Sequence, residues 1–463
     1  MTLSPRSLFS WFRMRLDIVK GLIKSRLWKD ISSEINAPIS IANDFFGINI
    51  ATSNDPACDD YIVASLRTLK IKHIRMNFSY DSIDSHGERL LNRVLDEGFD
   101  VLLNLLPPKK DAAVLVSNKV AIHYWKKFVK DIFHRYHDKI TSFEIGNASN
   151  RQKWSGYNPA SYIEACRLAR SYSKYYKITL AGPNISDFEP IYNIAYLKAL
   201  QRINAVPTIH TDNLFVERVV EPEAYDHRVL GRRAENKLKL NLVKKARIID
   251  NIGKEFDCKK TYATYQCWTI KRLSRWSKDP EQKQADYLTR YLILAAASDS
   301  LDRVYWGPLL CSRDGIIDDG SDINTYPEID NVSYYQQVRG NVKQFRQRPA
   351  FFALKFIRTL LSNATCTQGL SADNGISHFI FTHKNGSETH ITWCRDGLKI
   401  SSLSLYLRDL DEHVRYYDNL GKELDRMPLN ITEQPLFIHF PKGVPVYRPE
   451  QQFIENLAEL KPS

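Results

Sequence analysis

The sequence FEIGNASNRQKWSGYNP, from Phe143 to Pro159, joins a short apolar run to a turn rich in Asn, Ser and Gly. Residues 142–147 (SFEIGN) have the length and alternation of a β-strand. Because successive side chains of a strand point to opposite sides, Glu144, Gly146 and Ala148 share one face. The residues that follow the strand are therefore candidates for a functional site.

Short apolar runs of this kind alternate with helical patterns from about residue 45 to residue 360. Such alternation predicts an α/β fold with parallel strands, and eight strands predict a (β/α)8 TIM barrel. The expected strands are 45–50, 73–78, 100–106, 142–147, 178–184, 207–215, 261–268 and 302–309. We expect functional residues at their C-terminal ends.

The pattern changes after residue 362. Residues 378–397 read as two alternating strands joined by a turn at Asn385-Gly386. The helical segment 348–361 is expected to close the barrel just before them. We therefore expect three parts: a basic amphipathic N-terminal helix and extension (1–40), the barrel (41–362) and a small antiparallel β-sandwich-like domain (363–463).

The segment from Arg6 to Lys29 holds seven Arg or Lys and one acidic residue, Asp17. It has no uninterrupted apolar stretch typical of a secretory signal, and it is too charged to span a bilayer. Two interpretations remain open: a helix lying on an anionic membrane surface, and a helix packing on the barrel. The apolar residues of its predicted helix face are Phe9, Phe12, Leu16, Val19 and Ile23.

The formal net charge of +12 raises the question of nucleic acid, but no nucleic-acid-binding motif accompanies it, so we expect no nucleic-acid partner. Seven cysteines are widely spread, without metal-ligand spacing or a compact disulfide framework. Reduced thiols in a cytoplasm are the simplest account. We expect neither a metal nor a cofactor.

With the strands placed, the chain resembles clan A glycoside hydrolases, most closely family 39. The resemblance covers most of residues 45–445 and implies a barrel followed by a β-sandwich. It rests on the order of short motifs at successive strand ends: GIN, IRMNF, EIGNxxNRxKWSGY, AGPN, a His at the sixth strand, YxTYQCW and YWG. It further implies a retaining mechanism with two carboxylates about 5 Å apart.

This sequence departs from the family at both carboxylate positions. The acid/base position, after the fourth barrel strand, is Ala148, and the nucleophile position, after the seventh, is Tyr265. A methyl group cannot donate a proton, and a phenol with a pKa near 10 is a poor nucleophile without a base. The ordinary retaining mechanism is therefore expected to be absent.

Three kinds of residue could take the place of the missing carboxylates. Tyr265 resembles the Tyr nucleophile of some sialidases, but it also suits a side chain that fills a vacated pocket. Glu144 is expected to be a buried structural acid paired with Arg75. Other carboxylates follow later strands and are candidate replacement catalysts: Asp187, Asp212, Glu217 and Asp314.

Several residues that the resemblance associates with sugar binding are retained. Each also has a structural interpretation, such as capping the barrel core or bridging strands. The predicted substrate-binding residues are Arg75, Asn147, Trp154, His210, Trp268 and Trp306.

Three function classes follow. The first is a catalytically degenerate protein that engages an oligosaccharide or glycolipid in bacterial surface polysaccharide (lipopolysaccharide-type) biosynthesis or processing. The second is an active glycosidase or transglycosylase with relocated catalytic groups, so enzymatic activity stays an open question. The third is a structural protein without a glycan. For the first we expect a cytoplasmic location, peripheral on the inner membrane if Arg6–Lys29 binds lipid.

Overall fold

The computed structural model describes residues 35, 37–214, 221–224, 239–322, 337–371, 375–402 and 411–449. The predicted amphipathic helix at Arg6–Lys29 and the candidate carboxylate Glu217 lie outside these residues. No helix in the described ranges is long and apolar enough to cross a membrane. All seven cysteines are free thiols.

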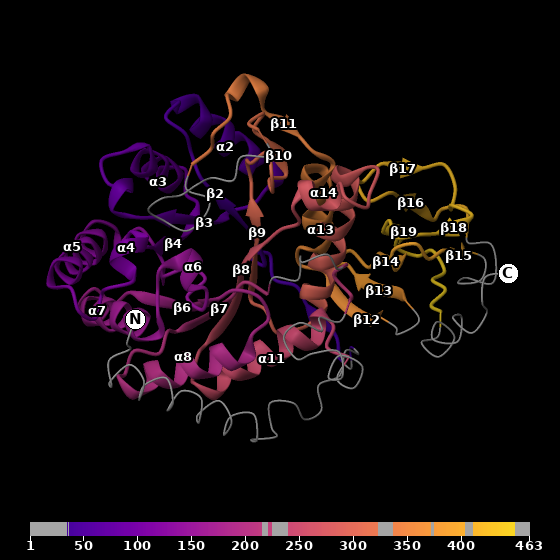
Figure 1. The fold of residues 1–463 in the computed structure, drawn as a ribbon. Helices are drawn as coiled ribbons and strands as arrows, with labels where there is room; N and C mark the ends of the chain where they lie inside the picture. The colour runs from indigo at the N-terminus through magenta and orange to yellow at the C-terminus, as the bar shows by residue number, and fades with distance from the viewer. Residues whose placement is uncertain are drawn as a thin grey trace.

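Eight parallel strands close into a barrel, which confirms the predicted fold (Figure 1). Neighbouring strands pair in sequence order, and the last strand pairs with the first. The barrel strands are β2 (Phe46–Ile50), β3 (His73–Phe78), β4 (Asp100–Leu105), β5 (Ser142–Ile145), β6 (Thr179–Ile185), β7 (Ile209–Asp212), β8 (Lys260–Gln266) and β9 (Arg303–Pro308).

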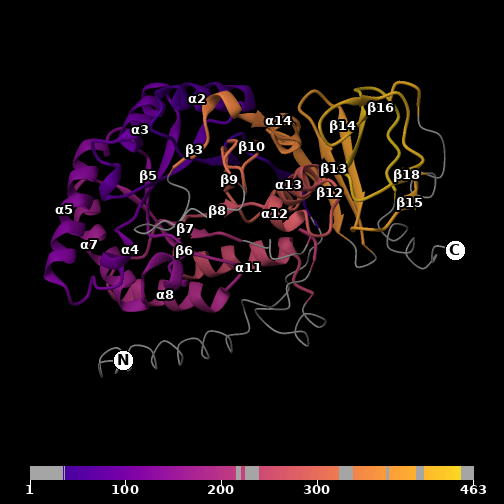
Figure 2. The ribbon, with the colours of Figure 1, turned by 45° about the horizontal axis from the view of Figure 1, so that its top comes forward.

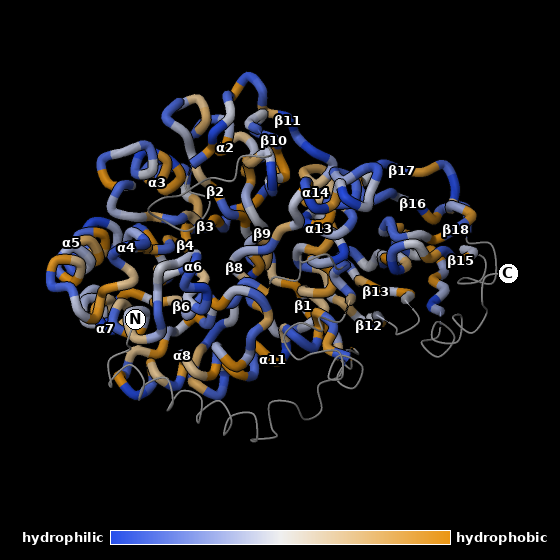
Figure 3. Tube along the Cα trace, viewed as in Figure 1, coloured by the Kyte–Doolittle hydropathy of each residue, from blue (hydrophilic) through white to orange (hydrophobic). Residues whose placement is uncertain are grey.

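Helices cover the outside of the barrel. The long ones are α2 (Pro56–Leu69), α3 (His86–Asp96), α5 (Lys119–Tyr136), α7 (Pro159–Tyr175), α8 (Pro190–Arg202), α11 (Leu242–Glu255), α13 (Pro280–Ala297) and α14 (Pro349–Leu361). The short ones are α4 (Lys109–Ala112), α6 (Gln152–Ser155) and α12 (Ile270–Leu273). Hydrophobic and hydrophilic residues alternate along covering helices such as α5 and α11 (Figure 3).

Local sequence signals explain where α7 begins. Asn158 precedes it, and the Asn158 Oδ1 accepts a hydrogen bond of 3.0 Å from the Ser161 backbone N–H. Pro159 occupies the first turn, where its missing N–H is not needed. The last residues of segment 143–159 therefore begin the helix that returns the chain to the bottom of the barrel.

The barrel interior has an apolar layer near its N-terminal end and a polar network above it. The apolar layer consists of Leu102, Ala181, Ile209, Tyr262 and Tyr305. These residues come from five different strands, as expected for inward side chains that fill the centre of a barrel.

The C-terminal residues form most of a seven-stranded antiparallel sheet that follows the barrel. The predicted hairpin at Asn385-Gly386 joins β13 (Ile376–Thr382) to β14 (Glu388–Cys394). The other strands of this sheet are β1 (Ile39–Ser40), β12 (Thr365–Ser371), β16 (Arg415–Tyr417), β17 (Glu423–Leu424) and β19 (Leu436–Phe440). Shorter antiparallel pairs are β15 (Ile400–Ser401) with β18 (Asn430–Ile431), and β10 (Ile317–Asp318) with β11 (Arg346–Gln347).

Strand β1 comes from the N-terminal part of the chain but pairs with β12 of the C-terminal sheet. Helices α13 and α14 lie between the barrel and this sheet (Figure 2). On the sheet side, the ring of Phe437 meets Phe356 of α14 at 4.8 Å between centroids. The barrel and the sheet therefore share one continuous apolar core.

A buried ionic cluster adds to this contact. Arg290 of α13 is fully buried, and its guanidinium donates to Glu223 at 2.9 Å and to Glu221 at 2.6 Å. It also donates to Asp396, which follows β14, at 2.9 Å. The indole of Trp393 donates to Glu223 at 2.7 Å. This charge cluster joins α13, a loop that follows β7 and the C-terminal sheet.

Candidate functional site

Ala148 lies in the loop that follows β5, at the C-terminal face of the barrel. Its backbone N–H donates to the Asn184 Oδ1 at 2.9 Å, and the next residue, Ser149, donates through its hydroxyl to the Pro183 carbonyl at 2.7 Å. The loop after β5 is therefore held against the end of β6. Only 1% of Ala148 is exposed.

Two residues at this face have a strained backbone. Ala148 has φ 46° and Leu214, which follows β7, has φ 44°, in the left-handed region that L-residues other than Gly, Asn and Asp rarely adopt. Each such residue costs about 1–2 kcal/mol, and strain of this kind is frequent at functional sites. By contrast, the left-handed Lys70 caps the end of α2, which is an ordinary structural use.

A polar network lies beneath Ala148 inside the barrel. The Nε of Arg75 donates to Glu144 at 2.7 Å, and the Nη1 donates to the Asn49 Oδ1 at 2.9 Å. The Asn184 amide donates to Glu144 at 2.7 Å and to the Thr264 hydroxyl at 3.0 Å. Arg75 and Glu144 side chains are fully buried. The predicted Arg75–Glu144 pair is present, and its burial removes Arg75 from the surface that a ligand can reach.

Tyr265 lies near the end of β8, where the pairing with β9 is irregular between Ala263 and Gln266. Such a bulge changes the direction of side chains and is common beside active sites. Burial, and to a lesser degree the neighbouring Cys267 and Asp314, raises the pKa of Tyr265 well above its usual value. The phenol is therefore protonated at neutral pH, which is unfavourable for a nucleophile.

Asp314 lies in the loop after β9, close enough to Tyr265 for an electrostatic effect. Its side chain is mostly buried, and the Nε of Arg313 lies 3.2 Å from its Oδ1. Burial raises the pKa of Asp314 despite the opposing charge of Arg313. A carboxyl group with a raised pKa is a suitable general acid.

Asp187, in the loop after β6, forms an ion pair with Arg151. The Nη2 of Arg151 lies 2.5 Å from the Asp187 Oδ2 and also contacts Glu189. Asp187 is buried and left-handed at φ 64°. This pair ties the loop after β5 to the loop after β6, so Asp187 supports the loop that carries Ala148.

His210 and Asp212 lie on the helix-facing side of β7, away from the polar network. The His210 Nε2 and the Asn193 Oδ1 of α8 are 2.7 Å apart, and the Asn193 amide donates to Asp212 at 2.8 Å. The inward residues of β7 are instead Ile209 and Thr211. Because side chains alternate along a strand, both residues point away from the barrel interior. His210 is therefore not placed to contact a ligand there, and Asp212 is not placed to replace a catalytic carboxylate.

Burial shifts the pKa of both side chains. It raises the pKa of Asp212 to about 8, although hydrogen bonds from Asn193 and the Leu214 backbone oppose the shift. It lowers the pKa of His210 to about 4. At neutral pH this pair is therefore mostly uncharged between the barrel and its helices.

Asp212→Asn is expected to gain stability relative to the wild-type protein as the pH rises from about 4 to about 8. The folded state keeps the Asp212 proton to a higher pH than the unfolded state, so that stabilisation is lost as pH rises through the folded pKa. The difference changes by at most about 1.4 kcal/mol per pH unit. Urea unfolding of both proteins at pH 5 and pH 8 measures this difference in the free energy of unfolding. The control Asp138→Asn, at an exposed position, should show no pH-dependent gain. A gain for Asp212→Asn that shrinks as the pH rises would contradict the raised pKa of Asp212.

Trp268 and Trp306 stack on one another with ring centroids 5.9 Å apart. Both rings also meet Tyr291 of α13, at 6.0 Å and 6.1 Å, and both residues are at most 1% exposed. They pack between the barrel and α13 as core residues. In this buried position neither tryptophan can serve as the predicted platform for a sugar.

Asn147 and Trp154 remain at the barrel mouth. Trp154 of α6 is partly exposed, and Asn147 is 3% exposed. Asn147 directly precedes Ala148 in the loop that follows β5. A buried amide needs hydrogen-bond partners from protein, water or a ligand.

Two residues outside the predicted set belong to the site. Asn184 connects Ala148 to Glu144, and its place directly after the AGP motif was a usable signal. Gln266, next to Tyr265, is fully buried, and neither amide atom has a partner among the described residues. No sequence pattern distinguishes such an unpaired amide. Within the same described part, no cluster of three or more ligand-type side chains suits a metal.

Comparisons with solved structures agree with this architecture. A family 39 glycoside hydrolase from Bacteroides cellulosilyticus WH2 matches with a TM-score of 0.61 and 15% identity over 86% of this chain and 81% of that chain. A family 39 β-xylosidase from Caulobacter crescentus and a glucosidase from Croceicoccus marinus each match with a TM-score of 0.54 and 12% identity over 88% of this chain. The match covers 98% of the β-xylosidase and 97% of the glucosidase.

The chain therefore has the fold of clan A glycoside hydrolases, with family 39 enzymes among its structural neighbours. No protein-family model and no curated protein sequence matches it. At these identities the likeness concerns the fold, and the chemistry has to be argued from the site itself.

Proposed function

We propose that this protein binds carbohydrate at the C-terminal face of its glycosidase-like barrel without performing two-carboxylate hydrolysis. This proposal rests on one observation. Ala148 and a protonated Tyr265 stand at the two strand ends where the enzymes that this chain resembles have carboxylates. Without a carboxylate at either position there is neither a proton donor nor a nucleophile for the retaining route.

A ligand contact is supported by Asn147, which directly precedes Ala148 at the barrel mouth. A sugar hydroxyl both donates and accepts hydrogen bonds, so it would satisfy the amide oxygen and the amide N–H. The partly exposed Trp154 lies in the same loop region and offers an aromatic face.

The proposed ligand is an oligosaccharide or glycolipid of a bacterial surface polysaccharide, of the lipopolysaccharide type. The proposed place is the cytoplasmic face of the inner membrane, with the basic segment Arg6–Lys29 contacting anionic lipid. Both points rest on the sequence of that segment and on the resemblance described above.

Asn147→Ala is expected to weaken binding of lipopolysaccharide-core oligosaccharide about tenfold, because it removes hydrogen bonds worth about 1–1.5 kcal/mol. Isothermal titration with the full chain measures this change. Asn430→Ala, at an exposed position of the C-terminal domain, is the control and should bind like wild type. No saturable binding of any oligosaccharide to the wild type would favour the purely structural alternative.

A second candidate is a hydrolase with a relocated acid. It is favoured by Asp314, whose raised pKa and nearness to Tyr265 suit proton donation. This candidate predicts cleavage products from the wild type that disappear in Asp314→Asn. Wild-type protein that binds glycan without forming products supports the first candidate instead.

A further inference from the structure

The outer side of α5 carries a cluster of exposed apolar side chains. Eight large hydrophobic residues are exposed in the described parts of the chain, and three of them are Val116, Val120 and Tyr124, at 50%, 60% and 53%. Val120 and Tyr124 are one helical turn apart in α5, and Val116 lies two residues before the helix cap Asn118. Single exposed apolar residues are ordinary, whereas a contiguous row of them marks a surface that contacts another molecule.

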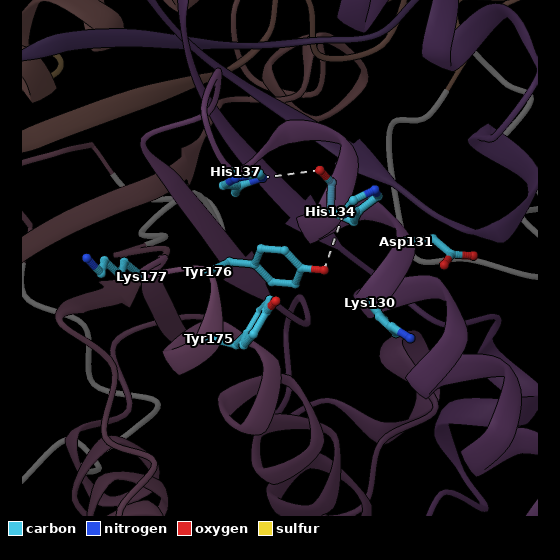
Figure 4. A pocket seen from close by; sticks show the side chains of 7 residues that line it. All are labelled: Lys130, Asp131, His134, His137, Tyr175, Tyr176 and Lys177. Atoms are coloured by element: carbon cyan, nitrogen blue, oxygen red, sulfur yellow. Dashed lines mark hydrogen bonds between the residues drawn. The ribbon is translucent and has the colours of Figure 1, made fainter.

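The same side of α5 is basic. Four exposed lysines have no ion-pair partner within the ranges that the structure describes, and Asp131 is the one acidic residue of the helix. Three of these lysines form a row beside the apolar one, because at 3.6 residues per turn they fall within about 40° around the helix axis. Figure 4, a close view of the far end of α5, shows the last of them, Lys130, with its ammonium group pointing away from Tyr175 and Tyr176. The basic row consists of Lys119, Lys126 and Lys130, and the fourth lysine, Lys127, continues the apolar row of Val120.

The inner side of α5 packs on the barrel core. The Trp125 indole donates to the Ala165 carbonyl of α7 at 3.2 Å, and the rings of Phe133 and Phe143 meet with centroids 4.9 Å apart. Helix α5 lies at the side of the barrel away from the C-terminal sheet (Figure 1). The packing of this helix therefore leaves its outer apolar row uncovered by the described chain.

The start of α5 lies at the same end of the barrel as Ala148. The chain leaves β4 at its C-terminal end and passes through α4 before it enters α5. Helix α4 contacts α6, which carries Trp154. The approach is close, because a Cβ at Gly156, which ends α6, would lie 2.1 Å from the Lys109 carbonyl oxygen. The apolar row of α5 thus begins at the barrel end where we place the glycan.

We propose that the outer side of α5 rests on an anionic lipid bilayer. Val116, Val120 and Tyr124 enter the headgroup region, and the lysines lie among the lipid phosphates with their aliphatic stems along the apolar row. A bilayer surface meets both rows at once, so no single ligand group has to bridge the lysines. Nucleic acid would satisfy the lysines but would leave the apolar row uncovered. The contact is separate from the one proposed for Arg6–Lys29 and does not depend on glycan binding.

A fluorophore at position 120 tests the proposal directly. Val120→Cys in the full chain is labelled with NBD, whose emission brightens and shifts to the blue when it enters a bilayer. Six of the seven native cysteines are buried, and wild type treated with the same label gives the background. We expect the change with vesicles of equal parts phosphatidylglycerol and phosphatidylcholine, and not with phosphatidylcholine alone. Leu429→Cys, labelled at an exposed apolar position of the C-terminal domain, should show no change.

Co-sedimentation with the same vesicles measures the strength of the contact. Tyr124→Asn/Lys126→Gln should lower the partition coefficient onto the anionic vesicles at least about tenfold. Phe352→Asn/Lys355→Gln is the matched control, since it removes one exposed aromatic residue and one exposed lysine from α14. It should partition like wild type.

The proposal is overturned if the label at position 120 does not respond, or if the control pair weakens vesicle binding as much as the α5 pair. Vesicle binding without a response at position 120 would overturn it in favour of a lipid contact through Arg6–Lys29 alone. Self-association of the wild type that Tyr124→Asn abolishes, without a response to vesicles, would overturn it in favour of a second copy of this chain.

Discussion

Arg290→Met is expected to lower the free energy of unfolding by about 3–5 kcal/mol. The guanidinium is fully buried and donates to Glu221, Glu223 and Asp396. Removing it leaves three carboxylates close together without their common cation. Their mutual repulsion and desolvation then oppose the packing of α13 against the C-terminal sheet.

Urea unfolding of the two proteins, measured under the same conditions, gives this change. Arg346→Met is the matched control, because Arg346 also pairs with two carboxylates, Glu281 and Asp318, but is 55% exposed. It should lose no more than about 1 kcal/mol. Adding Glu223→Gln to Arg290→Met should recover part of the loss. Equal losses for the buried and exposed arginines would contradict the assigned role of the cluster.

Ala148→Glu/Tyr265→Glu is expected to cleave a glycan that the wild-type protein only binds. A positioned acid/base contributes about 10²–10⁴ in rate, and a carboxylate nucleophile opens the covalent route. We therefore expect the double variant to exceed the wild-type rate by at least about 10²-fold. Mass spectrometry of the reaction mixture measures the products.

The single variants separate the two roles. An aryl glycoside with a good leaving group needs little protonation, so Tyr265→Glu alone should release the phenol from it once per site and hydrolyse it slowly thereafter. An unactivated oligosaccharide needs both carboxylates, so neither single variant should cleave it. Activity of Ala148→Glu alone on such an oligosaccharide would mean that a nucleophile already exists in this chain.

The barrel was predictable because its strands and helices alternate with different periodicities over more than 300 residues. The Arg75–Glu144 pair was also predictable, since strand parity turns Glu144 inward and a buried carboxylate needs a partner. The strand β1 was not, because two residues carry no periodicity and its partner β12 is more than 300 positions away.

The orientation of site residues was harder to predict than their position. Barrel strands are covered on both faces, so a polar or aromatic residue at a strand end does not reveal which face it occupies. His210 and Asp212 face α8 because alternation along β7 turns their neighbours Ile209 and Thr211 inward. Trp306 likewise faces α13, since its neighbour Tyr305 points into the barrel.

We propose that this glycosidase-like fold binds glycan without cleaving it. The most direct measurement is mass spectrometry of the wild-type protein incubated with lipopolysaccharide-core oligosaccharides that it binds in a parallel titration. We expect saturable binding and no change in the mass of the glycan over a long incubation. Shorter glycans, formed by the wild type and absent with Asp314→Asn, would contradict it and establish an active hydrolase.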